Sequence, residues 1–208
     1  MPICKRHLSR MRRPELKIHS CYPARKCSIN RPITLGIIVK DYIKNYREGA
    51  HGELAYFKVV KALDKAIEYA GLAKKQSGER FSHQKRISQI VLKRATAKLL
   101  KAKHRIKSCY NFDELIKLVQ STTGQVRGIG ELYIYDTALR LGAKLGIYPE
   151  KVYLHAGTRT GAQVIRLNTK QEAISLSEVP SELHKLKPHE IEDILCIYKD
   201  ELVQIRMN

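Results

Sequence analysis

Hydrophobic residues recur every three or four positions through much of the chain, which is the period of an α-helix packed on one side. The segment GELAYFKVVKALDKAIEYAGLAKK, residues 52–75, shows this pattern with lysines between the apolar positions. It predicts an amphipathic helix that ends at Gly71 or shortly after. The apolar stripe of this helix consists of Leu54, Phe57, Val60, Leu63 and Ile67.

A second amphipathic helix is predicted within SGERFSHQKRISQIVLKRATAKLLKAKHRIK, residues 77–107. Ser82 is a residue type that caps helix N-termini, and we expect it in that role. The apolar positions on successive turns are Ile87, Ile90, Val91 and Ala97. The polar face is the most basic in the chain, and it lacks acidic residues. It carries Lys85, Arg86, Lys93, Arg94, Lys98, Lys101 and Lys103.

Residues 111–146 predict two helices joined by a short turn. The first helix covers NFDELIKLVQSTTG, with Asn111 as its N-cap and Gly124 as its stop. Asp113 and Glu114 in its first turn complement the helix dipole. The turn reads GQVRGIG, and an apolar-striped segment follows it directly.

The remaining segments complete a mainly α fold with one multi-helix domain over residues 32–208. An irregular link follows residue 146, and a further helix starts near Lys187 to Glu190. Strand character is limited to KVYL, residues 151–154, and to PITLGIIV, residues 32–39, where helical spacing also begins. Residues 1–31 hold three prolines and little periodicity, which predicts an extended basic N-terminal arm.

The net charge of the chain and its distribution indicate which kind of partner the protein binds. The chain of 208 residues has a formal net charge of +19, and residues 1–107 hold 27 of its 39 Lys and Arg but only 7 of its 20 Asp and Glu. Such an excess favours a polyanionic partner, because neutralising phosphates releases counterions. A membrane surface is the competing polyanion, but Trp is absent and Phe occurs three times, whereas interfacial helices use both. We therefore expect a nucleic-acid partner and no membrane partner.

Cysteine usage and hydropathy point to a reducing compartment. Five cysteines at irregular spacing do not form a disulfide framework. No apolar run is long enough to span a membrane, and the N-terminus lacks the apolar region of a secretory signal, so we expect an intracellular protein of the cytoplasm or nucleoid. We expect no cofactor. Zinc bound in the arm remains an alternative, although the arm lacks a Cys-x-x-Cys pair. Its candidate ligands are Cys4, His7, His19, Cys21 and Cys27.

The turn GQVRGIG is the segment with the clearest chemical meaning. We expect Gly128 and Gly130 to adopt positive φ and to leave no side chain in the way of an approaching phosphate. Backbone N–H groups at the start of the following helix, near Glu131 and Leu132, would then face a phosphate oxygen with the helix dipole behind them. A tight turn that serves only helix packing is the alternative interpretation.

Residues 111–146 resemble the helix-hairpin-helix motif of DNA-repair proteins, which include the base-excision DNA glycosylases. The hairpin of that motif is hydrophobic-x-Gly-hydrophobic-Gly, and residues 126–130, VRGIG, match it. The resemblance implies sequence-independent contact with a nucleic-acid backbone at Gly128, Ile129 and Gly130, with Arg127 as a nearby charge. The basic residues Lys85, Arg86, Lys93 and Arg94 would extend this contact electrostatically.

Catalysis is less clearly indicated by the resemblance. The glycosylases carry a carboxylate shortly after the second helix, where this chain has Tyr153 or, in a shifted register, Glu150, and no lysine starts the helix. Asp136 lies four residues before Arg140, which is most simply an intrahelical ion pair. Glu150 and Asp136 are therefore retained only as candidate catalytic residues.

The stretch HAGTRTGA, residues 155–162, supplies the third catalytic candidate, His155, because an imidazole titrates near neutrality. Arg159 would bind phosphate or a base there. A helix N-terminus with a capping threonine is an equal alternative. His83 and Arg86 would face the same cleft if the second basic helix packs beside the turn.

The sequence therefore predicts a nucleic-acid-binding protein, with DNA favoured over RNA, related in type to glycosylase-like repair or genome-defence proteins. Under that hypothesis His155 and Arg159 would line a pocket for an extruded base. An RNA-binding structural protein of ribosomal type, without catalysis, is the alternative. A module whose basic face meets an acidic protein is a third hypothesis.

Overall fold

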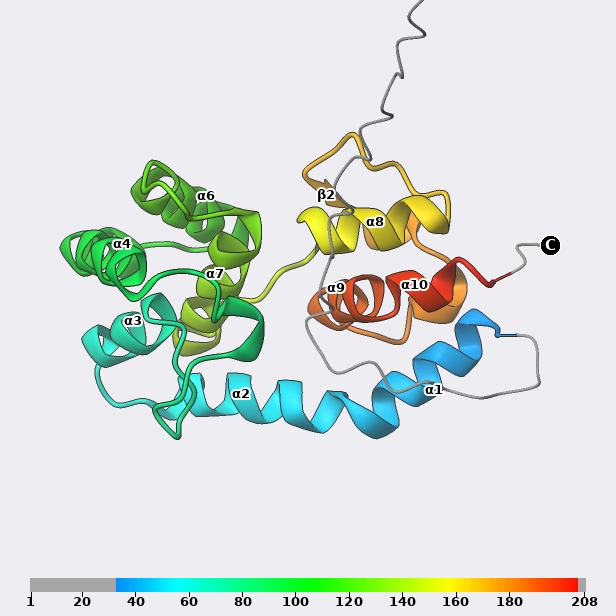
Figure 1. Ribbon diagram of the computed structural model, residues 1–208, viewed down its shortest axis with the longest axis horizontal. Coiled ribbons are helices and arrows are strands. Elements are labelled where there is room, and N and C mark those ends of the chain that lie inside the picture. Colours follow the sequence, from blue (N-terminus) through cyan, green and yellow to red (C-terminus); the bar gives the residue numbers. More distant parts are fainter. Residues whose placement is uncertain (1–32, 206–208) are drawn as a thin grey trace, which may run out of the picture.

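A computed structural model of the chain describes residues 33–205, which form ten α-helices, three short 3-10 helices and one two-stranded sheet (Figure 1). The fold is mainly α, as the sequence predicts. The α-helices are α1 Leu35–Asn45, α2 Arg47–Val59, α3 Leu63–Gly71, α4 Gln89–Lys101, α5 Lys103–Lys107, α6 Phe112–Thr123, α7 Glu131–Leu145, α8 Ala156–Val164, α9 Pro188–Ile197 and α10 Lys199–Leu202. The 3-10 helices are η1 Ser82–Gln84, η2 Leu176–Glu178 and η3 Ser181–Leu183.

The described residues form two lobes, which α1 and α2 join along one side (Figure 1). The first lobe contains α2 to α7, with α7 packed against α2, α3 and α6. Its main hydrophobic cluster gathers buried side chains from α2, α3, α4, α6 and α7, and a smaller cluster forms around Phe81, Leu92 and Tyr133. The first lobe is thus a helical bundle built around α7.

The second lobe combines the two ends of the described chain. Helix α1 packs against α9, and α8 lies across both α9 and α10. The strands β1 Val152–Tyr153 and β2 Ala173–Ile174 pair antiparallel, with Val152 opposite Ile174. The core of this lobe includes Val39, Tyr42 and Ile191, all fully buried. Strand β1 confirms the strand predicted at KVYL.

The continuous helix predicted over residues 52–75 is wrong, because the chain breaks between α2 and α3. Val60 has ψ 121° and α3 begins only at Leu63. The carbonyl of Val60 accepts a hydrogen bond from Lys144 Nζ on α7. The break lets α2 and α3 pack on different sides of α7, which a periodic pattern does not reveal. The predicted end at Gly71 is confirmed.

Helix α4 starts later than predicted and buries a different face. Its N-cap is Ser88, whose side chain accepts from the Val91 N–H, whereas Ser82 begins η1. Ile90 is 64% exposed and Ala97 is also exposed. The buried face is formed instead by Leu92, Ala95, Thr96 and Leu99. The predicted buried face was wrong because aliphatic side chains occur on more than one face of this helix. Their spacing alone does not identify the face that packs in the core.

Other predicted boundaries hold. Asn111 caps α6 through its side chain, which accepts from Glu114 N, and Gly124 follows the helix end. Helix α9 begins at Pro188 with Lys187 as N-cap. Strand character at residues 32–39 is wrong, because α1 starts at Leu35 after a Thr34 cap and packs one apolar face on the second lobe.

The predicted basic arm at residues 1–31 lies outside the described residues, as do its Cys and His side chains.

Candidate functional site

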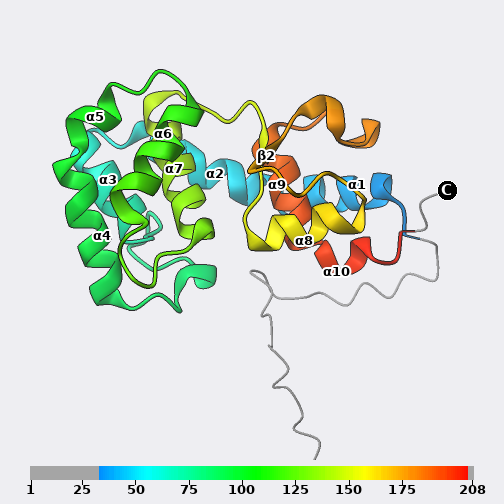
Figure 2. The same ribbon diagram turned by 90° about the horizontal axis from the view of Figure 1, so that it is seen from above.

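Helix α4 lies at the outer edge of the first lobe (Figure 2), and it carries most of a basic face. The basic face is defined here as Lys85, Arg86, Lys93, Arg94, Lys98 and Lys101, all exposed. Arg94, Lys98 and Lys101 follow one another at helical spacing. None of the six makes an ion pair with a carboxylate among residues 33–205, whereas the neighbouring Lys103 Nζ lies 2.8 Å from an Asp64 carboxylate oxygen. The basic face is therefore an uncompensated positive surface.

The turn between α6 and α7 packs directly on the start of α4. A Cβ added at Gly128 would lie 3.5 Å from both methyl groups of Val91, and Gly128 has φ +99°. The positive φ predicted for Gly128 is confirmed. Arg127 is exposed on the same turn. The turn and the basic face therefore belong to one continuous surface of the first lobe.

Gly130 and Ile129 differ from their predicted roles. Gly130 has φ −119°, so its predicted positive φ is wrong; it is extended because it serves as the N-cap of α7. The N–H of Ile129 donates to the Val126 carbonyl at 2.9 Å, and its side chain packs in the smaller hydrophobic cluster. The N–H groups of Gly128 and Gly130 have no acceptor within the described part of the chain.

A pocket of about 500 Å³ lies between the lobes. Its walls come from α6, α7, β1, α8 and the segment around β2. Tyr135 and Tyr153 line it with ring centroids 6.1 Å apart. Within residues 33–205, the buried hydroxyl of Tyr135 has no hydrogen-bond partner. The pocket therefore offers two aromatic rings, and the unsatisfied Tyr135 hydroxyl is buried in its wall.

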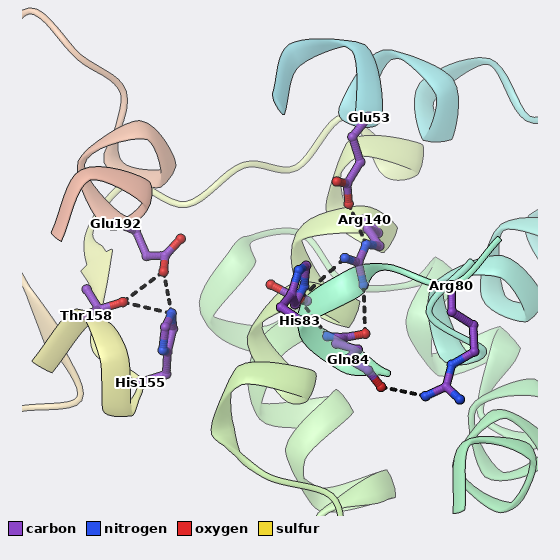
Figure 3. A network of polar contacts seen from close by, with 9 residues as sticks. Glu53, Arg80, His83, Gln84, Arg140, His155, Thr158 and Glu192 are labelled. Carbon is purple, nitrogen blue, oxygen red and sulfur yellow. Dashed lines mark hydrogen bonds and ion pairs between the residues drawn. The ribbon is translucent and has the colours of Figure 1, made fainter. Parts of the chain in front are cut away.

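His155 lies at the inner end of this pocket and is 3% exposed. Its Nε2 contacts Glu192 Oε1 and lies 2.8 Å from Thr158 Oγ1, whose hydroxyl also donates to Glu192 Oε1 at 2.8 Å (Figure 3). We call His155, Thr158 and Glu192 the His155 cluster. His155 is the N-cap of α8, so HAGTRTGA is a helix N-terminus rather than a loop, although Thr158 contacts the His155 ring instead of capping the backbone.

Arg159 and His155 both line the pocket, as the sequence predicts. The Arg159 guanidinium, however, donates to backbone carbonyls of the second lobe. Its NH2 donates to the Leu154 carbonyl at 2.8 Å and its NH1 donates to the carbonyls of Thr169 and Gln171. These bonds tie α8 to β1 and to the segment that leads into β2. Arg159 therefore links backbone segments. Its side chain is half-buried, and few of its N–H donors remain to bind a phosphate.

Asp136 belongs to a second polar network, with Glu53, His83, Gln84 and Arg140 (Figure 3). His83 Nε2 lies 2.7 Å from Asp136 Oδ2, and Arg140, which is 2% exposed, lies 2.6 Å from Glu53 and 3.4 Å from Asp136. The predicted Asp136–Arg140 pair is confirmed as one part of this Asp136 network. Burial alone would raise the pKa of Asp136, but the charges of Arg140 and His83 hold it below its usual value.

The two networks lie close to each other across the boundary between the lobes. The ring of Tyr135, one residue before Asp136 on α7, lies 5.9 Å from the ring of His155. The charge of His155 also contributes to the low pKa of Asp136. Figure 3 shows the His155 cluster and the Asp136 network in one view of this region. The structure therefore brings together two of the three predicted catalytic residues.

Glu150 and Arg86 do not join this region. Glu150 is exposed in the link after α7, and it does not line the pocket. Arg86 is exposed on the basic face, so of the predicted pair only His83 reaches the interior. His83 contacts Asp136 on α7, and neither His83 nor Arg86 is among the residues that line the pocket with His155.

Sequence reasoning missed Glu192, Glu53 and Tyr135. Glu192 contacts a residue 37 positions away, and Glu53 one 87 positions away, so no local spacing connects them. One signal was present: the helix PHEIEDILCI places Glu192 among residues that pack the second lobe, and a buried carboxylate needs a partner. Tyr135 was missed because it belongs to an apolar pattern that is typical of any amphipathic helix.

Comparisons of the chain with protein-family models, with curated proteins and with solved structures find no match. Within residues 33–205, no helix combines the length and apolar character needed to cross a membrane.

Proposed function

We propose that this protein binds the backbone of nucleic acid through the basic face and the turn between α6 and α7. The observation that carries the proposal is the uncompensated charge of the basic face. Six exposed cations on and before one helix have no carboxylate partner within residues 33–205, although exposed lysines elsewhere, such as Lys65 and Lys151, pair with acidic neighbours. Phosphates supply the missing counter-charge, and counterion release supplies the free energy.

The turn supports the same assignment. Within residues 33–205, the N–H groups of Gly128 and Gly130 next to the basic face have no acceptor, and no side chain caps the N-terminus of α7. A helix N-terminus attracts anions because its unpaired N–H groups carry partial positive charge. In this proposal, the segment from α6 to α7 acts as a helix-hairpin-helix, with Arg127 as an additional phosphate contact. The resemblance favours duplex DNA over RNA.

The test is fluorescence anisotropy with labelled duplex DNA and a structured RNA of equal length, titrated at several salt concentrations. The informative variant replaces Lys93, Arg94, Lys98 and Lys101 with Gln. Its control replaces four exposed lysines of the second lobe with Gln and changes the net charge equally. These control positions are Lys40, Lys44, Lys170 and Lys185.

We expect the α4 variant to lower affinity and to reduce the slope of log affinity against log salt by about 0.9 for each lost phosphate contact on DNA. The control should retain the wild-type slope. Equal effects of the two variants would show that the basic face has no special role. Stronger binding of RNA than of DNA would favour the structural RNA-binding alternative, and no binding at low salt would reject both.

The glycosylase-like part of the proposal concerns the pocket between the lobes, which opens beside Glu131 at the start of α7. Its volume of about 500 Å³ lies in the range of small-molecule sites. Incubation of the protein with duplexes that contain alkylated, oxidised or deaminated bases, followed by detection of abasic sites, tests base release. Binding without release from any of them would limit the function to recognition of the backbone.

A further inference from the structure

Three metal-ligating side chains meet inside the second lobe, beside the pocket. The Nε2 or Nδ1 of His155, a carboxylate oxygen of Glu192 and the Sγ of Cys196 all lie within 4.8 Å of one another. His155 and Glu192 are buried and Cys196 is half-buried. This is the one group of at least three His, Cys, Asp or Glu side chains within residues 33–205 that is close enough to hold a metal ion.

The backbone is arranged to bring these three groups together. Glu192 and Cys196 are four residues apart on α9, so they project from the same face of that helix toward α8. His155 caps the N-terminus of α8. A Cβ at Gly157 would lie 2.8 Å from the Sγ of Cys196, and a Cβ at Gly161 would lie 2.0 Å from the Leu195 carbonyl oxygen. The two helices can approach this closely only because glycine occupies both positions.

The donor set matches zinc. Zn²⁺ binds imidazole nitrogen, thiolate sulfur and carboxylate oxygen, and catalytic zinc sites use three protein ligands with one open position. The Thr158 hydroxyl donates to Glu192 Oε1 at 2.8 Å, which is the kind of hydrogen bond that orients a metal-binding carboxylate. A divalent cation would also balance the charge of a carboxylate and a thiolate held away from water.

The pocket gives a second, independent observation at the same place. Tyr135 is 3% exposed, its ring lies tilted against the His155 ring with centroids 5.9 Å apart, and its hydroxyl has no hydrogen-bond partner within the described residues. Buried hydroxyl groups are normally satisfied, and an exception calls for a ligand or water at that position. Tyr135 therefore adds an unsatisfied polar group to the region where His155 lines the pocket.

We propose that His155, Glu192 and Cys196 bind one Zn²⁺ ion, with its open coordination position directed to the pocket between the lobes. This site is separate from the basic face and does not depend on nucleic-acid binding. It also differs from the Cys and His residues of the N-terminal arm, so the experiment must exclude that arm as the source of a signal.

The experiment uses full-length protein in which Cys4, Cys21 and Cys27 are replaced by Ser, leaving Cys109 and Cys196. Metal-free protein is titrated with Co²⁺ as a spectroscopic substitute for Zn²⁺. The expected result is one equivalent of Co²⁺ with a thiolate-to-cobalt charge-transfer band, which excess Zn²⁺ abolishes. Cys196→Ser should remove the band, whereas Cys109→Ser, in the link between α5 and α6, should retain it.

Circular dichroism establishes that each variant is folded, and Glu192→Gln provides a second variant that keeps the side-chain volume. It should weaken Co²⁺ binding at least tenfold, in line with the loss of one of three ligands. The melting temperature of the arm-substituted protein should rise with added Zn²⁺ and should not respond in Cys196→Ser. Absence of the charge-transfer band, or an equal band in Cys196→Ser, would overturn the proposal and leave His155 and Glu192 as a hydrogen-bonded pair.

Discussion

The basic face and the interior of the two lobes distribute charge in opposite ways. The basic face carries exposed cations, and within residues 33–205 none of them pairs with a carboxylate. In the interior, the carboxylates of Asp136, Glu190 and Glu192 each contact a cation or an imidazole. Fully unpaired charge is tolerated at the surface because water solvates it, whereas buried charge requires partners.

The contrast predicts that the surface cations and the interior ion pairs affect different properties, namely the proposed binding and the stability of the fold. Removing a cation from the basic face should change binding and leave folding nearly unaffected, since exposed charges contribute little to stability. Removing one member of an interior pair leaves its partner buried and unpaired, so folding should suffer first. The predictions below test this separation, beginning with the interior.

The strongest test is Arg140→Met. The Arg140 guanidinium pairs with Glu53 and Asp136 and lies over the Phe81 ring, 3.9 Å from its centroid. Its removal leaves a buried Asp136 carboxylate without its main compensation, and we expect a loss of about 3–5 kcal/mol in the free energy of unfolding. Urea denaturation measures this loss. The same change at exposed Arg105 should alter stability by about 0.5 kcal/mol or less.

A double-mutant cycle tests whether the loss of stability in Arg140→Met comes from the unpaired charge of Asp136. Asp136→Asn combined with Arg140→Met removes the stranded charge, so the double variant should be more stable than the sum of the single losses predicts. Additive losses would mean that Arg140 stabilises the lobe through packing alone.

Acid should selectively weaken the second lobe through Glu190. Burial alone would raise the pKa of Glu190, but hydrogen bonds from the Arg47 side chain and the Lys187 N–H lower it to about 2. Because the folded-state pKa is depressed, this stabilisation is complete above the ordinary value of 4.5 and is lost as the pH falls toward 2. It amounts to roughly 3 kcal/mol.

The measurement compares wild type with Glu190→Gln between pH 6 and pH 2. We expect the wild type to be more stable at pH 6 and the difference to shrink to about a few tenths of a kcal/mol near pH 2, where Glu190 is about half protonated in the folded protein. A difference independent of pH would show that Glu190 stabilises the lobe by packing rather than by its charge.

The turn offers a smaller and more local test. Gly128 has φ +99°, which strains any side chain, so Gly128→Ala should cost about 1–2 kcal/mol of stability. Gly130 is extended and no atom lies within 4 Å of its added Cβ, so Gly130→Ala should cost less, about 0.5–1 kcal/mol, because alanine is a poorer N-cap than glycine. Thermal unfolding distinguishes the two, and equal costs would contradict the conformational difference between these glycines.

The smallest expected effect concerns Glu131, whose exposed carboxylate begins α7 beside the turn. If phosphate approaches this helix N-terminus, Glu131→Gln should strengthen duplex DNA binding about twofold to fivefold, corresponding to about 0.3–1 kcal/mol. Glu150→Gln is the matched control, because Glu150 follows the opposite end of α7. Equal gains from both variants would indicate general charge reduction and would argue against phosphate at the turn.

The local sequence signals were reliable where a residue acts on its own helix. Asn111, Gly124 and Gly71 mark helix ends correctly, because caps and stops work through neighbouring backbone groups. The Asp136–Arg140 spacing identified a real ion pair for the same reason. The signals failed at Val60 and Ala97, where contacts with α7 and the arrangement of the bundle decide which residues are helical and which are buried.

Residue types and short-range spacing were enough to predict the mainly α character, the helix boundaries at Gly71, Asn111 and Gly124, and the excess of positive charge in the first half of the chain. Tertiary packing determines that His155 meets Glu192 and Cys196, and that Arg159 binds backbone carbonyls instead of facing a ligand. These contacts join segments far apart in the chain. Their specificity comes from how α8 packs on α9, a close approach that the small volume of glycine permits.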